Sequence, residues 1–146
     1  MKTLEDPVWR IANLYLIQGE EGGQPIPFVL RAEQREFLTH AHPRSIIIKT
    51  RKLGFSTLSM VRGLDSCLTR ANHLFAVIDL TQKKAEEKLH MARTAYLRGP
   101  EHPDPAIALL WQEIHKRVRI VRDNDGWIGQ PRLPDIGCRG QSLRMA

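Results

Sequence analysis

The spacing of apolar positions along the chain predicts strands that alternate with helices. The run at 46–48 is short, consecutive and β-branched, which is typical of a strand buried on both faces, and the apolar run at 73–80 predicts a second buried strand. After each run, apolar residues recur every three or four positions, as they do in a helix with one buried face. The order strand, helix, strand, helix predicts an α/β fold with a mainly parallel sheet flanked by helices.

Residues near the N-terminus predict a first helix and a connector. Asp6 followed by Pro7 is typical of a helix start, and the apolar stripe that follows runs through about Gln18. Glycines and prolines between 19 and 27 indicate a turn-rich connector. An extended lead and a helix carrying Phe37 are expected next.

The second half of the chain predicts two more helices and a hairpin. Thr81 is a predicted N-cap for a long helix that ends at Gly99. A short helix is expected over 105–115, followed by a strand over 117–122 that pairs, across a turn, with 127–129. The arginines of that strand either contact phosphate or form a basic edge that discourages aggregation.

Length and composition indicate one globular domain with a polyanionic partner. The 146 residues are 42% hydrophobic and 26% charged, which is ordinary for a soluble protein. The formal charge of +6 favours nucleic acid as a partner. The absence of a long apolar run predicts a cytosolic protein without a membrane span. Cys67 and Cys138 lack metal-ligand or redox spacing and are expected to be reduced thiols.

The stretch RSIIIKTRKLGFST, residues 44–57, carries the candidate chemistry. It combines a predicted strand, a basic turn and a helix start, which is the context that a phosphate-binding loop requires. Against the pattern G-x-x-x-x-G-K-[ST], Gly54 takes the second glycine and Ser56 takes the hydroxyl. Phe55 stands where the lysine is expected, and Lys49 stands in place of the first glycine. The lysine is therefore displaced rather than lost.

A displaced lysine is still able to serve a phosphate site. Lys49, at the end of the predicted strand, would reach the β and γ phosphate oxygens as a point charge. Helix amides after Gly54 would supply further donors, and Ser56 would bind Mg²⁺. The alternative is a basic turn between a strand and a helix whose charges are simply solvated.

The loop resembles the deviant Walker A motif of the large terminase subunits of tailed phages. In that family a basic residue early in the loop, here Lys49, replaces the lysine after the glycine. Phe28 and Gln34 are similar to an aromatic and a glutamine that precede Walker A in terminases and superfamily 2 helicases, where the glutamine reads adenine. Thr81 begins a helix similar to a structural repeat of the family, and the run at 139–145 resembles the approach to Walker B.

The resemblance implies a partial RecA-like P-loop NTPase fold. Residues 1–27 would form an N-terminal helix and linker, 28–100 the nucleotide-binding core, and 101–146 a hairpin excursion and the approach to a Walker B strand that is missing. It implies the cofactors ATP and Mg²⁺, with Lys49 as the catalytic residue and Ser56 as the metal ligand. The nucleotide-binding residues it implies are Phe28, Gln34, Thr50, Arg51, Lys52, Gly54, Phe55, Ser56 and Thr57.

The implied function is the ATP-binding part of a motor that couples ATP hydrolysis to the translocation of double-stranded phage DNA into a procapsid. Its partners would be that DNA, the portal protein and the small terminase subunit, in the cytoplasm of a bacterial host. Asp79 lacks a second acidic neighbour and is not expected to be the Walker B carboxylate. Hydrolysis is expected to be poor, because the carboxylate that orients the attacking water belongs to the missing Walker B strand. The alternatives are a basic DNA-binding packaging-accessory protein and an inactive prophage remnant.

Overall fold

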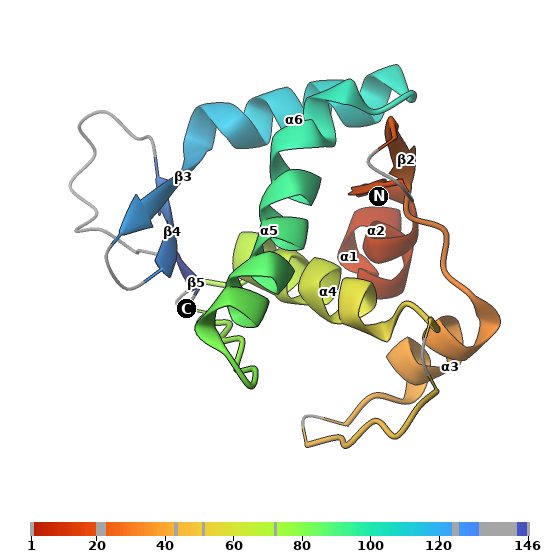
Figure 1. Ribbon diagram of the computed structural model, residues 1–146. Coiled ribbons are helices and arrows are strands. Elements are labelled where there is room, and N and C mark those ends of the chain that lie inside the picture. The colour runs from red at the N-terminus through yellow and green to blue at the C-terminus, as the bar shows by residue number, and fades with distance from the viewer. Residues whose placement is uncertain are drawn as a thin grey trace.

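The computed structural model of the protein describes residues 2–19, 23–42, 44–50, 52–71, 73–123, 126–131 and 143–145, and most of these residues are helical (Figure 1). The helices are α1 (Lys2–Glu5), α2 (Pro7–Asn13), α3 (Ala32–His40), α4 (Phe55–Thr69), α5 (Gln82–Arg98) and α6 (Pro105–Arg117), with a 3₁₀ turn, η2 (Gly99–Glu101), between the last two. The strands are β1 (Leu16–Gln18), β2 (Pro25–Pro27), β3 (Val118–Asp123), β4 (Gly126–Pro131) and β5 (Leu143–Met145).

The predicted α/β fold with a mainly parallel sheet is wrong. Within the described residues, β1 pairs with β2, and β4 pairs with both β3 and β5, and each of these pairings is antiparallel. The partial RecA-like fold that the resemblance implies is corrected by the same observation. The described chain is a group of packed helices with a small hairpin at each end.

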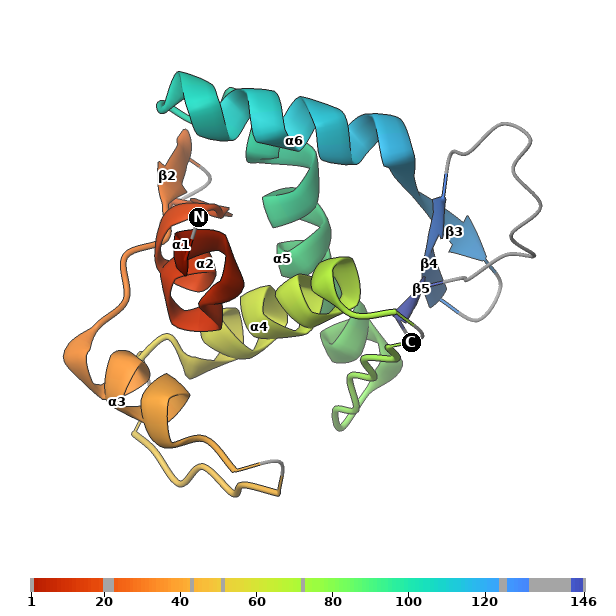
Figure 2. The same ribbon diagram turned by 180° about the vertical axis from the view of Figure 1, so that it is seen from behind.

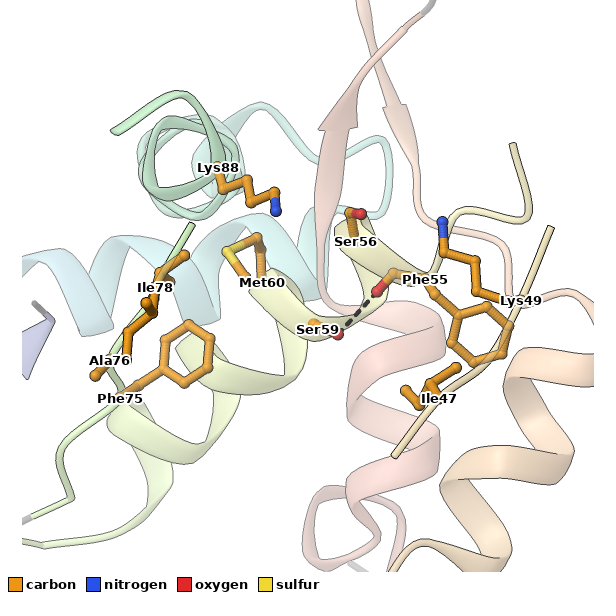
Figure 3. A pocket seen from close by; sticks show the side chains of 11 residues that line it. Ile47, Lys49, Phe55, Ser56, Ser59, Met60, Phe75, Ala76, Ile78 and Lys88 are labelled. Carbon is orange, nitrogen blue, oxygen red and sulfur yellow. Dashed lines mark hydrogen bonds between the residues drawn. The ribbon is translucent and has the colours of Figure 1, made fainter. Parts of the chain in front are cut away.

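The two apolar runs that predicted parallel strands are extended but form no sheet with each other. The side chains of Ile46 and Ile48 are 93% and 95% exposed, and that of Ile78 is 93% exposed. Along 73–80 exposure alternates, so that Phe75 and Val77 lie against the core while their neighbours point outward. Figure 3 shows Ile47 on one side of α4 and the 75–78 segment on the other. The consecutive apolar residues predicted a strand buried on both faces. In the described fold only one face of each segment is covered.

The core is built around α4 and α5. Helix α4 crosses the middle of the molecule and packs against both α2 and α5 (Figures 1 and 2). Helix α6 lies across the far end of α5 and contributes Trp111, which is 1% exposed. Buried residues of α2, α4, α5 and α6 join in one apolar cluster, against which the partly buried Ile17 of β1 packs, and this burial holds the short elements together.

The predicted helix ends are largely confirmed. The Asp6 carboxylate accepts a hydrogen bond from the Val8 N–H at 2.9 Å, and the Thr81 hydroxyl accepts one from the Lys84 N–H at 3.3 Å. The first long helix ends at Asn13 rather than near Gln18, because β1 begins two residues after its C-cap and pairs with β2. The apolar residues that predicted a longer helix, beyond Asn13, belong in part to β1, which faces the same core as α2.

The predicted C-terminal hairpin is confirmed. Strand β3 follows α6 directly and pairs with β4 in the register Val118 to Pro131 and Asp123 to Gly126. The hairpin stands away from the helices at one end of α6 (Figures 1 and 2). Of the run at 139–145, only β5 is described, paired with β4.

Cys67 is a buried free thiol, and its burial raises its pKa to about 11. Cys138 lies outside the described residues.

An ion-pair network that the sequence did not predict joins α2, α4 and the residue before β1. The Arg10 guanidinium donates to both Asp65 carboxylate oxygens, at 2.9 and 2.8 Å, and the Tyr15 hydroxyl donates to one of them at 2.9 Å. The Asp65 side chain is 4% exposed. Burial, together with the neighbouring Asp65 carboxylate, raises the pKa of Tyr15 well above its usual value.

Candidate functional site

The backbone turns sharply immediately before α4. Lys52 and Gly54 both have positive φ angles, 65° and 70°. The first intrahelical hydrogen bond that follows is donated by the Leu58 N–H to the Gly54 carbonyl at 3.0 Å. The amides of Phe55, Ser56 and Thr57 therefore have no acceptor within the helix and form the positive end of its dipole. This is the arrangement that suits an anion.

Two residues at the start of α3 hold this turn in place. The Gln34 side chain donates to the Leu53 carbonyl and accepts from the Arg31 N–H, both at 3.0 Å. The Arg31 guanidinium donates to the Lys52 carbonyl at 3.0 Å. A Cβ atom placed on Gly54 would lie 2.8 Å from the Gln34 Nε2 atom. Gly54 is therefore required both by its φ angle and by the close approach of Gln34.

We expect Gly54→Ala to lower the free energy of unfolding by about 1–2 kcal/mol, the cost of the left-handed conformation for a residue with a Cβ atom. Urea denaturation measures the change. Gly54→Asn is the matched control, since asparagine tolerates positive φ better but carries the same Cβ atom. A smaller loss for asparagine assigns the difference to backbone strain. Wild-type stability of the alanine variant would contradict the described turn.

A hollow of about 340 Å³ lies beside the first turns of α4. Lys49 reaches it from the extended segment before the turn and Lys88 from α5, with Ser56 between them (Figure 3). Among the described residues, Lys49 has no ion-pair partner and the Ser56 hydroxyl has no hydrogen-bond partner. The Ser59 hydroxyl, by contrast, donates to the Phe55 carbonyl at 2.8 Å (Figure 3). Two polar groups thus face the hollow without partners.

The structure brings together some of the predicted site residues. Lys49, Phe55 and Ser56 line the hollow. Thr50 and Lys52 are exposed nearby, Thr57 is half-buried in the first turn of α4, and Arg51 lies outside the described residues. The nucleotide-binding roles of all these residues stay predictions.

The two residues expected to contact adenine lie elsewhere. Phe28 is 4% exposed, belongs to the apolar core and does not line the hollow. Gln34 is 2% exposed, and its amide is bonded to Arg31 and Leu53 as described above. In this structure Gln34 supports the turn, and its reading of adenine stays a prediction.

Sequence reasoning missed Lys88, which lies on α5 and was not expected to belong to the site. Its ammonium lies 2.7 Å from the Asp79 carboxylate, with the two side chains 35% and 15% exposed. The Lys88 ammonium and the Leu80 N–H hold the pKa of Asp79 below its usual value. Asp79 precedes the Thr81 cap by two residues, and this nearness to the helix start is the only sequence signal that could have suggested the pair.

The described residues contain no cluster of three or more His, Cys, Asp or Glu side chains arranged to hold a metal ion. Nor does that part of the chain hold a helix long and apolar enough to cross a membrane. Comparison of the chain with protein-family models, curated proteins and solved structures finds no match. The resemblance to large terminase subunits rests on the loop at 49–57 and on the shorter similarities around it.

Proposed function

We propose that the first turn of α4 binds the phosphates of ATP together with Mg²⁺. The observation that supports this most is the convergence of unpartnered donors on one hollow: the Lys49 ammonium, the Ser56 hydroxyl and the free amides at the helix start. Backbone amides at a helix N-terminus and an ammonium group are what phosphate oxygens bind best. On the resemblance of the loop, we further propose that the chain serves as the ATP-binding part of a terminase-like DNA-packaging motor.

The residues present fit a magnesium nucleotide better than a free metal ion. Mg²⁺ prefers oxygen ligands and keeps several waters, so one hydroxyl and the phosphate oxygens suffice. Ser56 would supply that hydroxyl. No acidic residue lines the described part of the hollow, so the ion would arrive with the nucleotide rather than before it.

We expect the pure chain to bind ATP weakly and to hydrolyse it negligibly. Phosphoryl transfer to water requires a residue that orients the attacking water. Asp79 is near the hollow, but its carboxylate is held by the Lys88 ammonium and the Leu80 amide. Robust hydrolysis by the chain alone would overturn this part of the proposal.

Calorimetric titration with a non-hydrolysable ATP analogue and Mg²⁺ tests binding. We expect Lys49→Ala to weaken binding about 10- to 100-fold, since a hydrogen bond to a charged group contributes about 1.5–3 kcal/mol. Lys83→Ala is the matched control, because Lys83 is exposed on α5 and does not line the hollow. Equal affinity of the wild type and the Lys49 variant would contradict the site.

The second candidate function, a basic DNA-binding accessory protein, is favoured by the net charge of +6. It predicts binding of duplex DNA that weakens steeply with salt and does not respond to nucleotide. A DNA-binding titration with and without the ATP analogue separates the two candidates. DNA binding that is insensitive to nucleotide, together with no calorimetric signal for nucleotide, would favour the accessory protein.

A further inference from the structure

The hollow beside α4 has a second ammonium group, which comes from a different element. Lys49 lies on the extended segment before the turn, whereas Lys88 lies in the second turn of α5. Their side chains approach the start of α4 from opposite sides, with Ser56 between them (Figure 3). A polyphosphate carries negative charge along its length. Two lysines on opposite sides of Ser56 therefore place positive charge where two phosphate groups of such a chain would lie.

The ion pair between Lys88 and Asp79 is built so that it can open. The Asp79 carboxylate also accepts a hydrogen bond from the Leu80 N–H at 2.7 Å, so it keeps a partner when Lys88 leaves. Lys88 carries its charge on a flexible four-carbon stem and is 35% exposed, so its ammonium is able to move without disturbing the core. Lys84, the other charged residue acting on Asp79, supplies a second positive charge nearby.

We propose that Lys88 is a second phosphate-binding residue of this site and that it stays ion-paired with Asp79 until a polyphosphate binds. This inference rests on the proposed function and adds to it a second cation, Lys88, which would contact a phosphate group other than the one that Lys49 contacts. In the free protein the Lys88 ammonium forms an ion pair with the Asp79 carboxylate. In the complex, phosphate oxygens replace the carboxylate, which keeps its hydrogen bond to the Leu80 amide. Asp79 thus lowers the affinity for polyphosphate by competing for Lys88.

Four variants test the exchange by titration with Mg²⁺ and the non-hydrolysable ATP analogue, and with tripolyphosphate alone. We expect Lys88→Gln to weaken binding of both ligands by about tenfold, the value of one charge-assisted contact. Asp79→Asn is expected to strengthen binding, because it removes the competitor. In the double variant the gain from Asp79→Asn should largely disappear, since there is no lysine to release. Lys83→Gln, an exposed lysine of the same helix, should leave affinity unchanged.

Salt dependence and charge rescue distinguish a phosphate contact from a structural role. Loss of one cation from the site should make the affinity of Lys88→Gln less sensitive to salt than that of the wild type, because less charge is screened. Lys88→Arg should keep most of the affinity. If Lys88→Gln lowers only the thermal midpoint and leaves affinity and its salt dependence unchanged, the proposal is wrong and the ion pair is structural.

The Lys49→Ala variant separates phosphate binding by the site from the role of Lys88 in it. If Lys49→Ala weakens binding but Lys88→Gln does not, the site binds phosphate without Lys88 and only the present proposal fails. If wild-type protein binds neither the nucleotide analogue nor tripolyphosphate, the proposed function fails as well. Stronger binding of inorganic phosphate than of tripolyphosphate would also overturn the assignment of a polyphosphate ligand.

Discussion

Replacing Asp65 by alanine is expected to lower the free energy of unfolding by about 3–5 kcal/mol, the usual cost of removing one partner of a buried ion pair. The Asp65 carboxylate accepts hydrogen bonds from Nε and Nη2 of Arg10 and from the hydroxyl of Tyr15. Without it, the Arg10 guanidinium, whose side chain is only 13% exposed, loses its anionic partner, and the Tyr15 phenol, which is 2% exposed, loses its acceptor. Urea denaturation followed by circular dichroism measures the change.

Loss of the Asp65 carboxylate should affect the whole fold, because its contacts join segments far apart in the sequence. Arg10 and Asp65 are 55 residues apart, so their contact ties the N-terminal helix to α4. Arg10 also donates to the Leu4 carbonyl at 2.7 Å, which extends the tie to α1. The matched control is Glu113→Gln, which removes the partner of Lys116 in an exposed pair and should leave stability almost unchanged. Equal effects of the two variants would contradict the described burial of Asp65.

Replacing Trp111 by alanine is expected to lower the free energy of unfolding by about 3–5 kcal/mol, as is usual when a large aromatic side chain is removed from a core. The indole is 1% exposed and contacts the rings of Tyr15 and Tyr96 edge-on, with centroids 5.5 and 5.9 Å apart. Its Nε1 donates to the Leu14 carbonyl at 2.7 Å. The variant therefore loses packing, aromatic contacts and a buried hydrogen bond together.

The expected loss reflects how closely the ring fits. A Cβ atom on Gly99 would lie 2.1 Å from the indole, so the turn between α5 and α6 leaves room for the ring only because residue 99 is a glycine. Leu109→Ala, on an exposed position of the same helix, is the control and should change stability by less than about 1 kcal/mol. A small loss for Trp111→Ala, comparable with that of Leu109→Ala, would show that α6 does not close the core.

Local signals predicted the parts of the fold that depend on neighbours in sequence. Asp6 and Thr81 cap helices as expected, because the capping hydrogen bond spans only two or three residues. The hairpin of β3 and β4 was predicted for the same reason, since a short turn sets its pairing. In the candidate site, the spacing of the motif proposed Lys49, Gly54 and Ser56, and the last two belong to one continuous turn and helix start.

Contacts between distant residues could not be predicted in this way. The isoleucines at 46–48 have the composition of a buried strand, yet whether a strand acquires ladder partners depends on segments far away in sequence. The pairing of Lys88 with Asp79, the support of Leu53 by Gln34, and the network at Asp65 likewise join elements whose positions are set only when the helices pack.

By itself, the sequence determined the helix starts, the hairpin and the loop that resembles a deviant Walker A motif, because each is specified by hydrogen bonds and steric limits within a few residues. Only the tertiary structure decided that the runs at 46–48 and 73–80 form no parallel sheet with each other and that Gln34 holds the turn before α4. It also decided that a second lysine faces Ser56 from α5. Those features depend on which surfaces pack together, and the free energy of that packing is shared among residues throughout the chain.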